Sequence, residues 1–446
     1  MPDRGPSRSR VGIVSGFVLA LVALGTVVTA APSGASSFPG ANGLIAFERY
    51  DGSTYNIATV STSDRVVHPL IDTGDNDVEP AWSPDGGRIA FVKNVLSGEI
   101  YLANADGSGV HRVTNNSLED YDPTWAPDAA RVAWVQYDNV HGVSRILIAN
   151  RWGTILGTLA RIRGQIIAPS WSPDGRRIAY ANWCSTCVDY QIFVLNTLTG
   201  TRTNITRDGR LNDFPEWSPD GSRIAFYSID RHEDPPTDAG LWIMNADGSN
   251  EHLFSSAIDD DHAAWSPDGS MIAAKSGDCG GSATNGWGIC LFPVNGGPSI
   301  QLTISPNQAT ALDSFPTWQP VCTMTGTDGN DTIQGSSHRD VICAGPGDDV
   351  VHGGGGNDVI FGFGGNDNIT GDAGSDVVSG MDGDDSVTGG DGRDWVVAGG
   401  GVDVARGGGW NDLVDGVDLQ PGDTVDGGAG VDACRSDTGD TRTSCE

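Results

Sequence analysis

The chain has 446 residues, a length that favours two or three domains over one small core. Aspartate and glutamate outnumber lysine and arginine by 58 to 26, and so acidic a chain repels nucleic acid and favours cations as partners. The 63 glycines and 13 tryptophans are typical of turns and short strands, so the composition predicts an all-β protein.

The N-terminal segment, residues 1–30, has the pattern of an export signal. Three arginines precede an uncharged apolar run over residues 11–28, and small residues follow the run. The run is longer than most signal cores, so a retained membrane anchor is the alternative, and only an uncleaved segment would contact a membrane. We expect the rest of the chain, after a linker at 31–37, to be secreted, extracellular or at the cell surface.

The eight cysteines are consistent with an oxidising compartment. Their order suggests local disulfides, although the sequence alone leaves other connectivities open. The expected pairs are Cys184 with Cys187, Cys279 with Cys290, Cys322 with Cys343, and Cys434 with Cys445. The spacing of Cys184 and Cys187 is also that of a redox motif, but such a motif begins a helix, and this one lies between two predicted strands.

A long repeat organises residues 38–320. The motif Trp-Ser-Pro-Asp-Gly, or a close variant, recurs at intervals of 43 to 48 residues, and a sixth, truncated copy follows. The blade tryptophans are Trp82, Trp125, Trp171, Trp217, Trp265 and Trp318. Proline followed by Asp-Gly predicts a tight turn, and a short apolar strand such as Ile89-Ala-Phe91 follows each turn. Two further strands complete each repeat, as expected for one blade of a β-propeller.

The two ends of this array predict how the propeller closes. Residues 42–47 have the pattern of a second strand without a first, whereas Trp318 belongs to a first strand without a second. Together the two halves complete one blade. The sequence therefore predicts a six-bladed ring over residues 38–320, closed by pairing of its C-terminal strand with its N-terminal strand, which removes the exposed edge.

At these motifs the module resembles the TolB-type β-propellers, whose repeat contains the same Trp-Ser-Pro-Asp-Gly followed by an Ile-Ala-Phe strand. The resemblance implies a scaffold that binds a protein or glycan partner. Some related propellers accompany a peptidase domain, but the sequence contains neither a Gly-x-Ser-x-Gly elbow nor a His-Glu-x-x-His pair. We therefore predict that the protein is not an enzyme and has no catalytic residues.

An enzymatic alternative is a polysaccharide lyase or hydrolase that uses acids and a histidine at the channel mouth. Glu79, Asp122 and His262 each stand three residues before a blade tryptophan, which makes them the candidates. An acid or amide also recurs five residues before the tryptophan, at Asp77, Asp120, Asn212, Asp260 and Asp313. A feature repeated in so many blades is more typical of turn capping than of catalysis.

After Cys322 the period falls to nine residues. Ten aspartates follow one another at this spacing from Asp331 to Asp412, and an apolar residue stands two places after each. Residues 353–361, Gly-Gly-Gly-Gly-Asn-Asp-Val-Ile-Phe, resemble the hemolysin-type, or RTX, nonapeptide. The resemblance implies a parallel β-roll over 326–415, with two repeats in each coil, preceded by a linker at 321–325 and followed by a cap at 416–446.

The composition of this repeat suits calcium, a hard cation that takes six to eight oxygen ligands from carboxylates and carbonyls. Glycines allow the turns to expose their carbonyls, and the fixed aspartates bring the charge. Stacked turns would share an ion between aspartates 18 residues apart, such as Asp349 with Asp367 and Asp358 with Asp376. The candidate calcium ligands are Asp331, Asp349, Asp358, Asp367, Asp376, Asp385, Asp394, Asp403, Gly353, Gly355, Gly362 and Gly364.

Residues 326–415 contain 17 aspartates and only three arginines, so we expect this segment to fold only with calcium. A disordered acidic linker is the alternative, but composition alone would not hold a strict nine-residue spacing. His338 and Trp410 replace the fourth-position glycine of their turns, and we expect weak coordination there. The tail is then a calcium-switched structural element and a display stalk.

Overall fold

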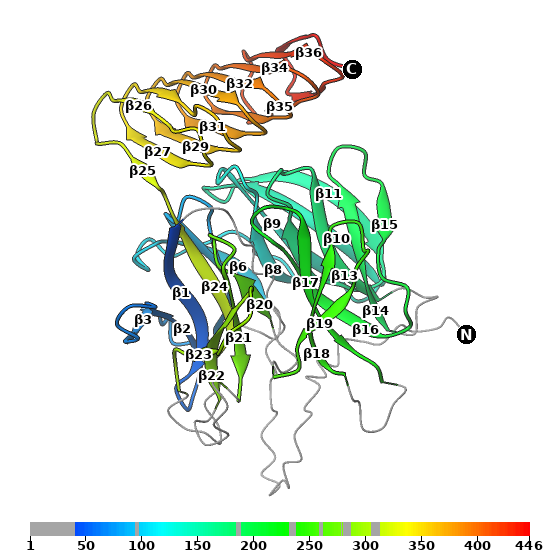
Figure 1. Ribbon diagram of the computed structural model, residues 1–446. Coiled ribbons are helices and arrows are strands. Elements are labelled where there is room, and N and C mark those ends of the chain that lie inside the picture. Colours follow the sequence, from blue (N-terminus) through cyan, green and yellow to red (C-terminus); the bar gives the residue numbers. More distant parts are fainter. Residues whose placement is uncertain are drawn as a thin grey trace, which may run out of the picture.

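The computed structural model describes residues 41–93, 98–183, 189–231, 238–257, 262–277, 279, 287–304 and 313–446. The N-terminal signal, the Cys184–Cys187 pair and Asp260 lie outside these residues. The described residues form strands in two modules, a ring of sheets and an elongated solenoid (Figure 1). They include no helix long and apolar enough to cross a membrane.

The ring is a six-bladed β-propeller of six four-stranded antiparallel sheets. One blade is β24 (Asp313–Val321), β1 (Ala41–Tyr50), β2 (Tyr55–Val60) and β3 (Val67–Ile71). Two further blades are β4 (Asp77–Trp82), β5 (Arg88–Lys93), β6 (Glu99–Asn104) and β7 (His111–Arg112), then β8 (Glu119–Trp125), β9 (Arg131–Asp138), β10 (Val143–Asn150) and β11 (Ile155–Arg163).

The remaining blades follow in chain order. They are β12 (Ile166–Trp171), β13 (Arg177–Trp183), β14 (Tyr190–Asn196) and β15 (Arg202–Asn204), then β16 (Leu211–Trp217), β17 (Arg223–Ile229), β18 (Gly240–Asn245) and β19 (His252–Ser255). The last is β20 (Ala263–Trp265), β21 (Met271–Ser276), β22 (Gly288–Pro293) and β23 (Ile300–Gln301).

The closure predicted from the two half-motifs is confirmed. Strand β24 pairs antiparallel with β1, and Trp318 lies opposite Ile45 in the register. The six blade tryptophans are each no more than 2% exposed and fill the contacts between blades. The Trp125 indole N–H donates to the Ala81 carbonyl of the neighbouring blade at 3.1 Å, so the motif joins blades as well as ending a strand.

The C-terminal module is a parallel β-solenoid of two seven-stranded sheets. The first sheet, called the docked sheet below, contains β25 (Met324–Thr325), β27 (Val341–Pro346), β29 (Val359–Gly364), β31 (Val377–Asp382), β33 (Trp395–Gly400), β35 (Leu413–Gly416) and β37 (Ala433–Ser436). The second, the outer sheet, contains β26 (Thr332–Gln334), β28 (Val350–His352), β30 (Asn368–Ala373), β32 (Ser386–Asp391), β34 (Val404–Gly409), β36 (Thr424–Ala429) and β38 (Thr441–Thr443).

Neighbouring strands in each solenoid sheet come from residues 18 apart, as in Ile342 opposite Ile360, so two nonapeptides make one coil as expected. The apolar residue that follows each aspartate forms a thin core, which includes Ile342, Val351, Ile360, Ile369, Val378, Val387, Val396, Ala405, Val414 and Val425. The solenoid does not end at residue 415. Strands β36, β37 and β38 continue both sheets after a two-residue insertion, because Val404 pairs with Thr424.

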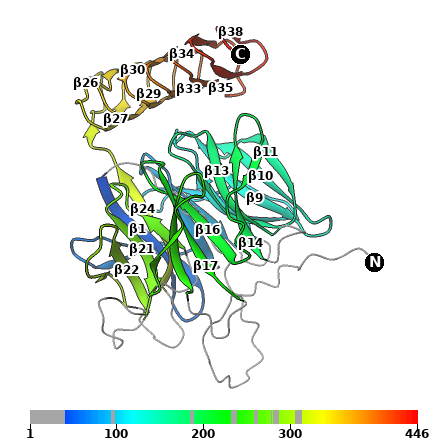
Figure 2. The same ribbon diagram turned by 45° about the vertical axis from the view of Figure 1, so that its right-hand side comes forward.

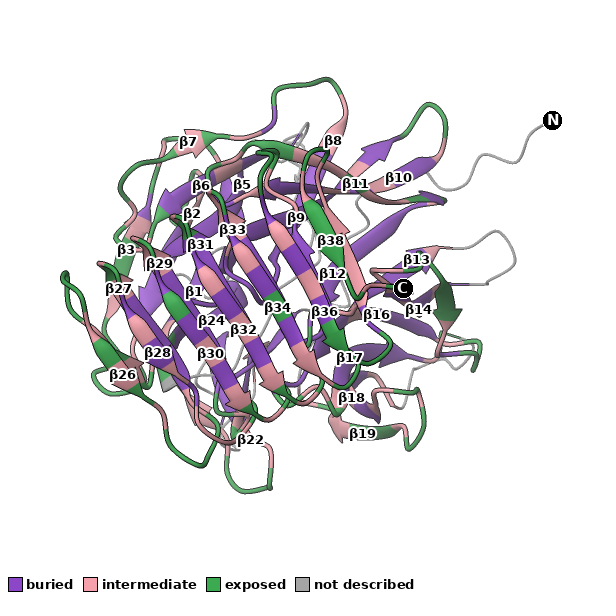
Figure 3. Cartoon of the chain, turned by 90° about the horizontal axis from the view of Figure 1, so that it is seen from above, coloured by how far each residue is buried: buried purple, intermediate pink, exposed green. Residues whose placement is uncertain are grey.

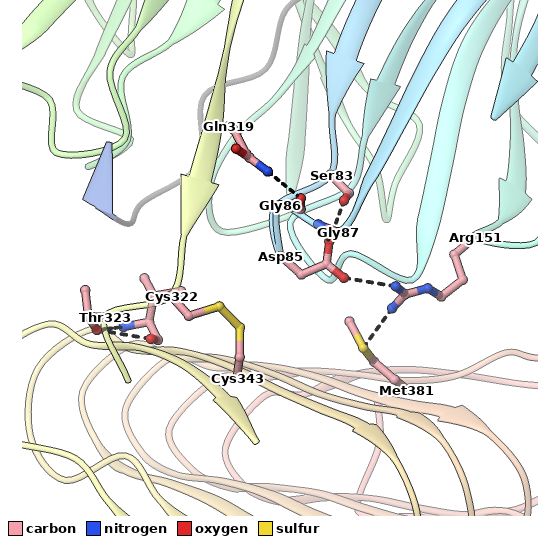
Figure 4. The surroundings of a disulfide bond; sticks show 11 residues. Ser83, Asp85, Gly86, Gly87, Arg151, Gln319, Cys322, Thr323, Cys343 and Met381 are labelled. Atoms are coloured by element: carbon pink, nitrogen blue, oxygen red, sulfur yellow. Dashed lines mark hydrogen bonds and ion pairs between the residues drawn. A yellow bond between two sulfur atoms is a disulfide. The ribbon is translucent and has the colours of Figure 1, made fainter. Parts of the chain in front are cut away.

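Three of the expected disulfides are present in the described residues. Cys279 pairs with Cys290, Cys322 with Cys343, and Cys434 with Cys445, with Cα–Cα distances of 5.9, 5.9 and 5.7 Å. The Cys322–Cys343 bond lies where the chain leaves β24 for the solenoid (Figure 4).

The solenoid lies across one face of the propeller (Figures 1 and 2), so the expectation of a projecting display stalk is wrong. The outward residues of the docked sheet share one hydrophobic cluster with three propeller blades, and they are Val341, Cys343, Val359, Phe361, Val377, Trp395, Val397 and Leu413. Trp395 stacks on Trp171, with ring centroids 6.2 Å apart. The outer sheet faces away from the propeller (Figure 3).

Polar contacts fix this interface at several Trp-Ser-Pro-Asp-Gly turns. The Arg131 guanidinium bonds to Asp128 of its own blade and to Asp415 of the solenoid, each at 2.6 Å, and all three residues are nearly fully buried. Arg151 joins Asp85 to the Met381 sulfur, both at 2.9 Å (Figure 4). The solenoid is therefore attached by apolar packing and by specific hydrogen bonds.

Candidate calcium sites

The repeated aspartates form two ladders, one along each long edge of the solenoid. In each ladder the backbone N–H of one aspartate donates to the Oδ1 of the aspartate one coil later. Asp349 N–H donates to Asp367 at 2.8 Å, and Asp358 N–H donates to Asp376 at 2.8 Å. The aspartates predicted to pair across 18 residues are thus neighbours in the structure.

The second carboxylate oxygen, Oδ2, is buried in ten of these aspartates and accepts no hydrogen bond from the described residues. Each of the ten residues is at most 2% exposed, and they are Asp349, Asp358, Asp367, Asp376, Asp385, Asp394, Asp403, Asp412, Asp423 and Asp432. Buried polar atoms in folded proteins almost always have a partner, and a buried carboxylate without one carries a large desolvation cost. These oxygens are therefore available to a cation.

In seven of these ten turns the free oxygen faces the glycine that begins the turn, and in the turns of Asp349 and Asp403 an alanine takes that position. A Cβ added to Gly362 would lie 2.4 Å from Asp367 Oδ2 and 2.5 Å from the Gly380 carbonyl oxygen of the next coil. At Gly371 the corresponding distances, to Asp376 Oδ2 and to the Gly389 carbonyl, are 2.5 and 2.6 Å. A carboxylate and a carbonyl thus converge on a space that any side chain would fill, and both are the hard oxygens that calcium prefers.

The predicted glycines differ in their surroundings. A Cβ on Gly353 would lie 2.8 Å from Asp358 Oδ2, so Gly353 and Gly362 border candidate sites. For Gly355 and Gly364 the nearest atoms to such a Cβ are 3.7 and 3.8 Å away and are not carboxylate oxygens. The glycine at the first position of the turn therefore lies beside the free oxygen, whereas the glycine at the third position does not.

The first two turns differ from the later ones because the Oδ2 of their aspartate already accepts hydrogen bonds. Asp331 Oδ2 accepts hydrogen bonds from the backbone N–H and the hydroxyl of Thr327, at 2.6 and 2.8 Å. Asp340 Oδ2 accepts the same two bonds from Ser336. Threonine or serine stands at the second position of these turns, where the later turns have mostly glycine, and this was the sequence signal for the difference.

The two turns expected to coordinate weakly are also distinct. The turn with His338 is the one in which Asp340 is already bonded to Ser336. The turn with Trp410 keeps the ladder geometry, because Trp410 adopts a φ of 82° and Asp412 retains a buried Oδ2 without a hydrogen bond among the described residues. Trp410 itself is 69% exposed and does not occupy the site.

Burial of the ladder carboxylates disfavours their charged form. It raises the pKa of Asp376 and Asp385 to about 8, and the pKa of Asp394 and Asp403 to about 7, with neighbouring carboxylates adding to the effect. Without a cation the centre of each ladder would therefore hold protons near neutral pH.

Asp423 and Asp432 extend the ladders beyond the strict nine-residue spacing. Asp403 N–H donates to Asp423 Oδ1 and Asp412 N–H donates to Asp432 Oδ1, both at 2.9 Å. The sequence prediction did not include them, because a two-residue insertion within residues 416–422 breaks the nine-residue phase. The described residues contain no group of three or more His, Cys, Asp or Glu side chains arranged to hold a metal. At Gly362 and Gly371 the converging atoms are one carboxylate oxygen and one backbone carbonyl oxygen.

The candidate catalytic acids of the propeller accept hydrogen bonds from backbone N–H groups. The Asp122 N–H donates to Glu79 Oε2, and the Ala168 N–H donates to Asp122 Oδ2, both at 2.8 Å. These N–H groups belong to bulged residues with positive φ, 53° at Asp122 and 51° at Ala168. The carboxylates thus stabilise a strained turn of the neighbouring inner strand.

His262 has different surroundings. Its ring lies between Phe214 and Phe315, with centroid distances of 4.3 and 4.8 Å, and the residue is 3% exposed. Burial lowers the pKa of His262 well below its usual value. Among the residues expected five places before a blade tryptophan, Asp77 caps Thr73, and Asp313 bonds to Arg49.

Comparison with known families and structures agrees with this architecture. The TolB beta propeller domain family matches residues 129–331, and the RTX calcium-binding nonapeptide repeat matches four segments, 323–351, 344–378, 370–405 and 379–414. No curated protein matches the chain.

Among solved structures, TolB from Acinetobacter baumannii is 18% identical, with a TM-score of 0.52 over 62% of this chain and 67% of that one. A putative TolB from Agrobacterium tumefaciens is 21% identical, with a TM-score of 0.47 over 63% and 100%. At these identities the likeness concerns the fold alone. The chain thus consists of a TolB-type β-propeller domain followed by RTX calcium-binding nonapeptide repeats.

Proposed function

We propose that this protein is an exported calcium-binding protein whose solenoid folds on calcium and whose propeller is a scaffold for a protein or glycan partner. The observation that carries the calcium part is the set of ten buried Oδ2 atoms without hydrogen-bond partners among the described residues. Calcium held by these oxygens would remove the desolvation cost, and its binding free energy would contribute to folding. The disulfides and the RTX repeats support a location outside the cell.

The ions would be held along both edges of the solenoid. At each site the ligands on this chain would be one aspartate Oδ2, such as that of Asp367, and the carbonyl of the first-position residue of the next coil, such as Gly380. Ten aspartates would serve in this way, and Asp331 would not, because its Oδ2 is already bonded to Thr327.

The proposal that the propeller binds rather than catalyses rests on the roles of its buried polar residues. Glu79 and Asp122 each accept a hydrogen bond from a backbone N–H of the next blade. A carboxylate that turned toward a substrate would give up this hydrogen bond and leave the strained bulge without support. His262 is enclosed by two phenylalanine rings. These contacts support structural roles for all three candidates of the lyase or hydrolase alternative.

The test is a calcium titration of the chain, followed by circular dichroism and by native mass spectrometry, which counts bound ions. We expect several ions per chain and a gain of β-structure signal with calcium. Asp367→Asn should bind fewer ions than wild type, whereas Asp331→Asn, the matched control from the first turn, should bind the same number. Equal spectra in calcium and in chelator, with no bound ions, would refute the calcium proposal.

A further inference from the structure

The solenoid ends in a coil that differs from all the others. The turn over residues 427–432 has the sequence of a complete nonapeptide turn, but it lies beyond the residues that match the RTX family. Asp432 is 2% exposed, its Oδ1 accepts the Asp412 N–H, and its Oδ2 has no partner among the described residues. One side of a cation site is therefore in place.

The opposite side of this site does not come from a nonapeptide. A Cβ added to Gly427 would lie 2.2 Å from the Ser444 carbonyl oxygen and 2.9 Å from Asp432 Oδ2. One coil earlier the same test at Gly407 meets the Gly427 carbonyl at 2.4 Å and Asp412 Oδ2 at 2.6 Å. The Ser444 carbonyl thus takes the place that a first-position glycine carbonyl has in the preceding coil.

Ser444 directly follows β38, which pairs with β36. Its φ is 51°, a left-handed conformation that is unfavourable for serine. The next residue, Cys445, forms the disulfide with Cys434, and the Glu446 N–H donates to the Asp432 carbonyl at 2.9 Å. Cys434 stands two residues after Asp432, and Cys445 directly follows Ser444. The Cys434–Cys445 bond therefore ties the Ser444 carbonyl to the strand that follows Asp432.

We propose that Asp432 Oδ2 and the Ser444 carbonyl form a terminal calcium site, and that the Cys434–Cys445 disulfide is required to assemble it. Reduction of this disulfide removes the covalent tether of the segment that carries Ser444 and leaves it held by the pairing of β38 with β36 and by hydrogen bonds. The Ser444 carbonyl is then no longer fixed opposite Asp432, while the upstream sites keep their ligands. Calcium loading of the last coil is then coupled to the redox state of the surroundings. This inference rests on the proposed calcium binding by the upstream ladder.

The experiment counts calcium ions on the full chain by native mass spectrometry, at increasing calcium. Three variants remove one part of the site each: Asp432→Asn, Gly427→Ala, and the double variant Cys434→Ser/Cys445→Ser. We expect each to bind one ion fewer than wild type. Adding Asp432→Asn to the double cysteine variant should cause no further loss, because both changes remove the same ion.

Two matched controls accompany these variants. Asp331→Asn removes an aspartate whose Oδ2 is bonded within its own turn, and Cys279→Ser/Cys290→Ser removes a propeller disulfide with the same sequence separation of 11 residues. Both should bind as many ions as wild type. Circular dichroism in saturating calcium checks that every variant folds.

The outcomes are distinct. No ions on wild type would refute the proposed function together with this inference. Ions on wild type but an unchanged count in Asp432→Asn and Gly427→Ala would overturn only the terminal site. A loss in those two variants with a full count in the folded cysteine variant would overturn the role of the disulfide. If the cysteine variant does not fold, wild type is titrated with reductant instead, and cleavage of the half-buried Cys434–Cys445 bond is followed by thiol labelling. An ion count that stays unchanged after this bond is cleaved would also overturn the role of the disulfide.

Discussion

The two sheets of the solenoid are built from the same nonapeptide but have different surroundings. In both sheets the second residue of most strands, such as Ile360 and Ile369, points into the thin core. The residues on either side of it are largely apolar in the docked sheet, as in Val359 and Phe361, and mostly polar in the outer sheet, as in Asn368 and Thr370. One repeat can therefore form an ion-binding edge, a core and an interface at the same time, because different residues of the strand and turn determine each of them.

The largest expected effect concerns what the two sheets share, the calcium edges. In chelator at about pH 8, where the ladder carboxylates are ionised, both sheets should unfold together, and the thermal transition of the solenoid should disappear while that of the propeller remains. Differential scanning calorimetry in chelator and in millimolar calcium measures this. Magnesium should not restore the transition, since it demands a smaller octahedral site. A solenoid transition that persists in chelator would contradict the prediction.

Trp395→Ala tests the docked sheet. The side chain is 2% exposed, and it packs so closely on the propeller that a Cβ at Gly175 would lie 1.9 Å from the ring. Loss of a buried aromatic side chain costs about 3–5 kcal/mol. Ser386→Ala, on the outer sheet, should change stability by less than about 0.5 kcal/mol. Urea unfolding in saturating calcium measures both, and equal effects would remove the distinction between the sheets.

Arg131→Met tests the charged part of the docked interface. It leaves Asp128 and Asp415 buried without their cation, which for a broken buried pair costs about 3–5 kcal/mol. The triple variant Arg131→Met/Asp128→Asn/Asp415→Asn should recover much of this loss, because no uncompensated charge remains. Chemical denaturation of the three proteins checks the order, and a triple variant less stable than the single one would contradict it.

The pH dependence should differ between the calcium-free and calcium-bound solenoid. The pKa of Asp376 and Asp385 rises from 3.8 to about 8 in the calcium-free fold. Their contribution to stability is therefore fully present below about pH 4 and is lost as the pH rises to about 8. In chelator a thermal transition of the solenoid should therefore appear at low pH, where these carboxyl groups are protonated, and disappear as the pH rises over this window. In calcium the carboxylates must be ionised, so the gain from calcium should grow with pH; a gain independent of pH would contradict the assignment.

The smallest effect separates two aspartates of the ladders. Asp376→Asn should remove a calcium ligand and weaken binding measurably, because its Oδ2 has no partner among the described residues. Asp340→Asn should have little effect on binding, since Ser336 already occupies that oxygen. Isothermal titration of the two variants compares them directly. A larger loss from Asp340→Asn would contradict the division between the first two turns and the rest.

Much of the fold could be predicted because repetition reveals it. The half-motifs at 42–47 and Trp318 determine the closing pair, and the nine-residue phase predicts two repeats per coil. The docking of the solenoid does not follow from the nine-residue spacing, because that spacing is the same in every nonapeptide. The signal lies in alternate repeats, where Val377 and Trp395 stand at the position that the polar residues Asn368 and Ser386 have in the other sheet.

The calcium sites were predicted in type but not in every member. Asp331 satisfies the pattern, yet its neighbour Thr327 takes the oxygen that the pattern assigns to a cation. Asp432 departs from the phase, yet the chain returns it to the ladder because a two-residue insertion is absorbed in the loop. The nine-residue spacing predicts where each aspartate lies in the backbone. Whether its Oδ2 is left without a hydrogen bond depends on the side chain four residues earlier, such as Thr327 before Asp331.

The junction between the two modules has a mechanical consequence. Strand β24 closes the propeller against β1, and the solenoid begins at Met324, three residues after β24 ends. The Cys322–Cys343 bond ties that junction to the second strand of the docked sheet. A pulling force on the C-terminal coil is therefore transmitted to the strand that seals the ring, which would bear it along the length of its hydrogen-bonded pairing with β1.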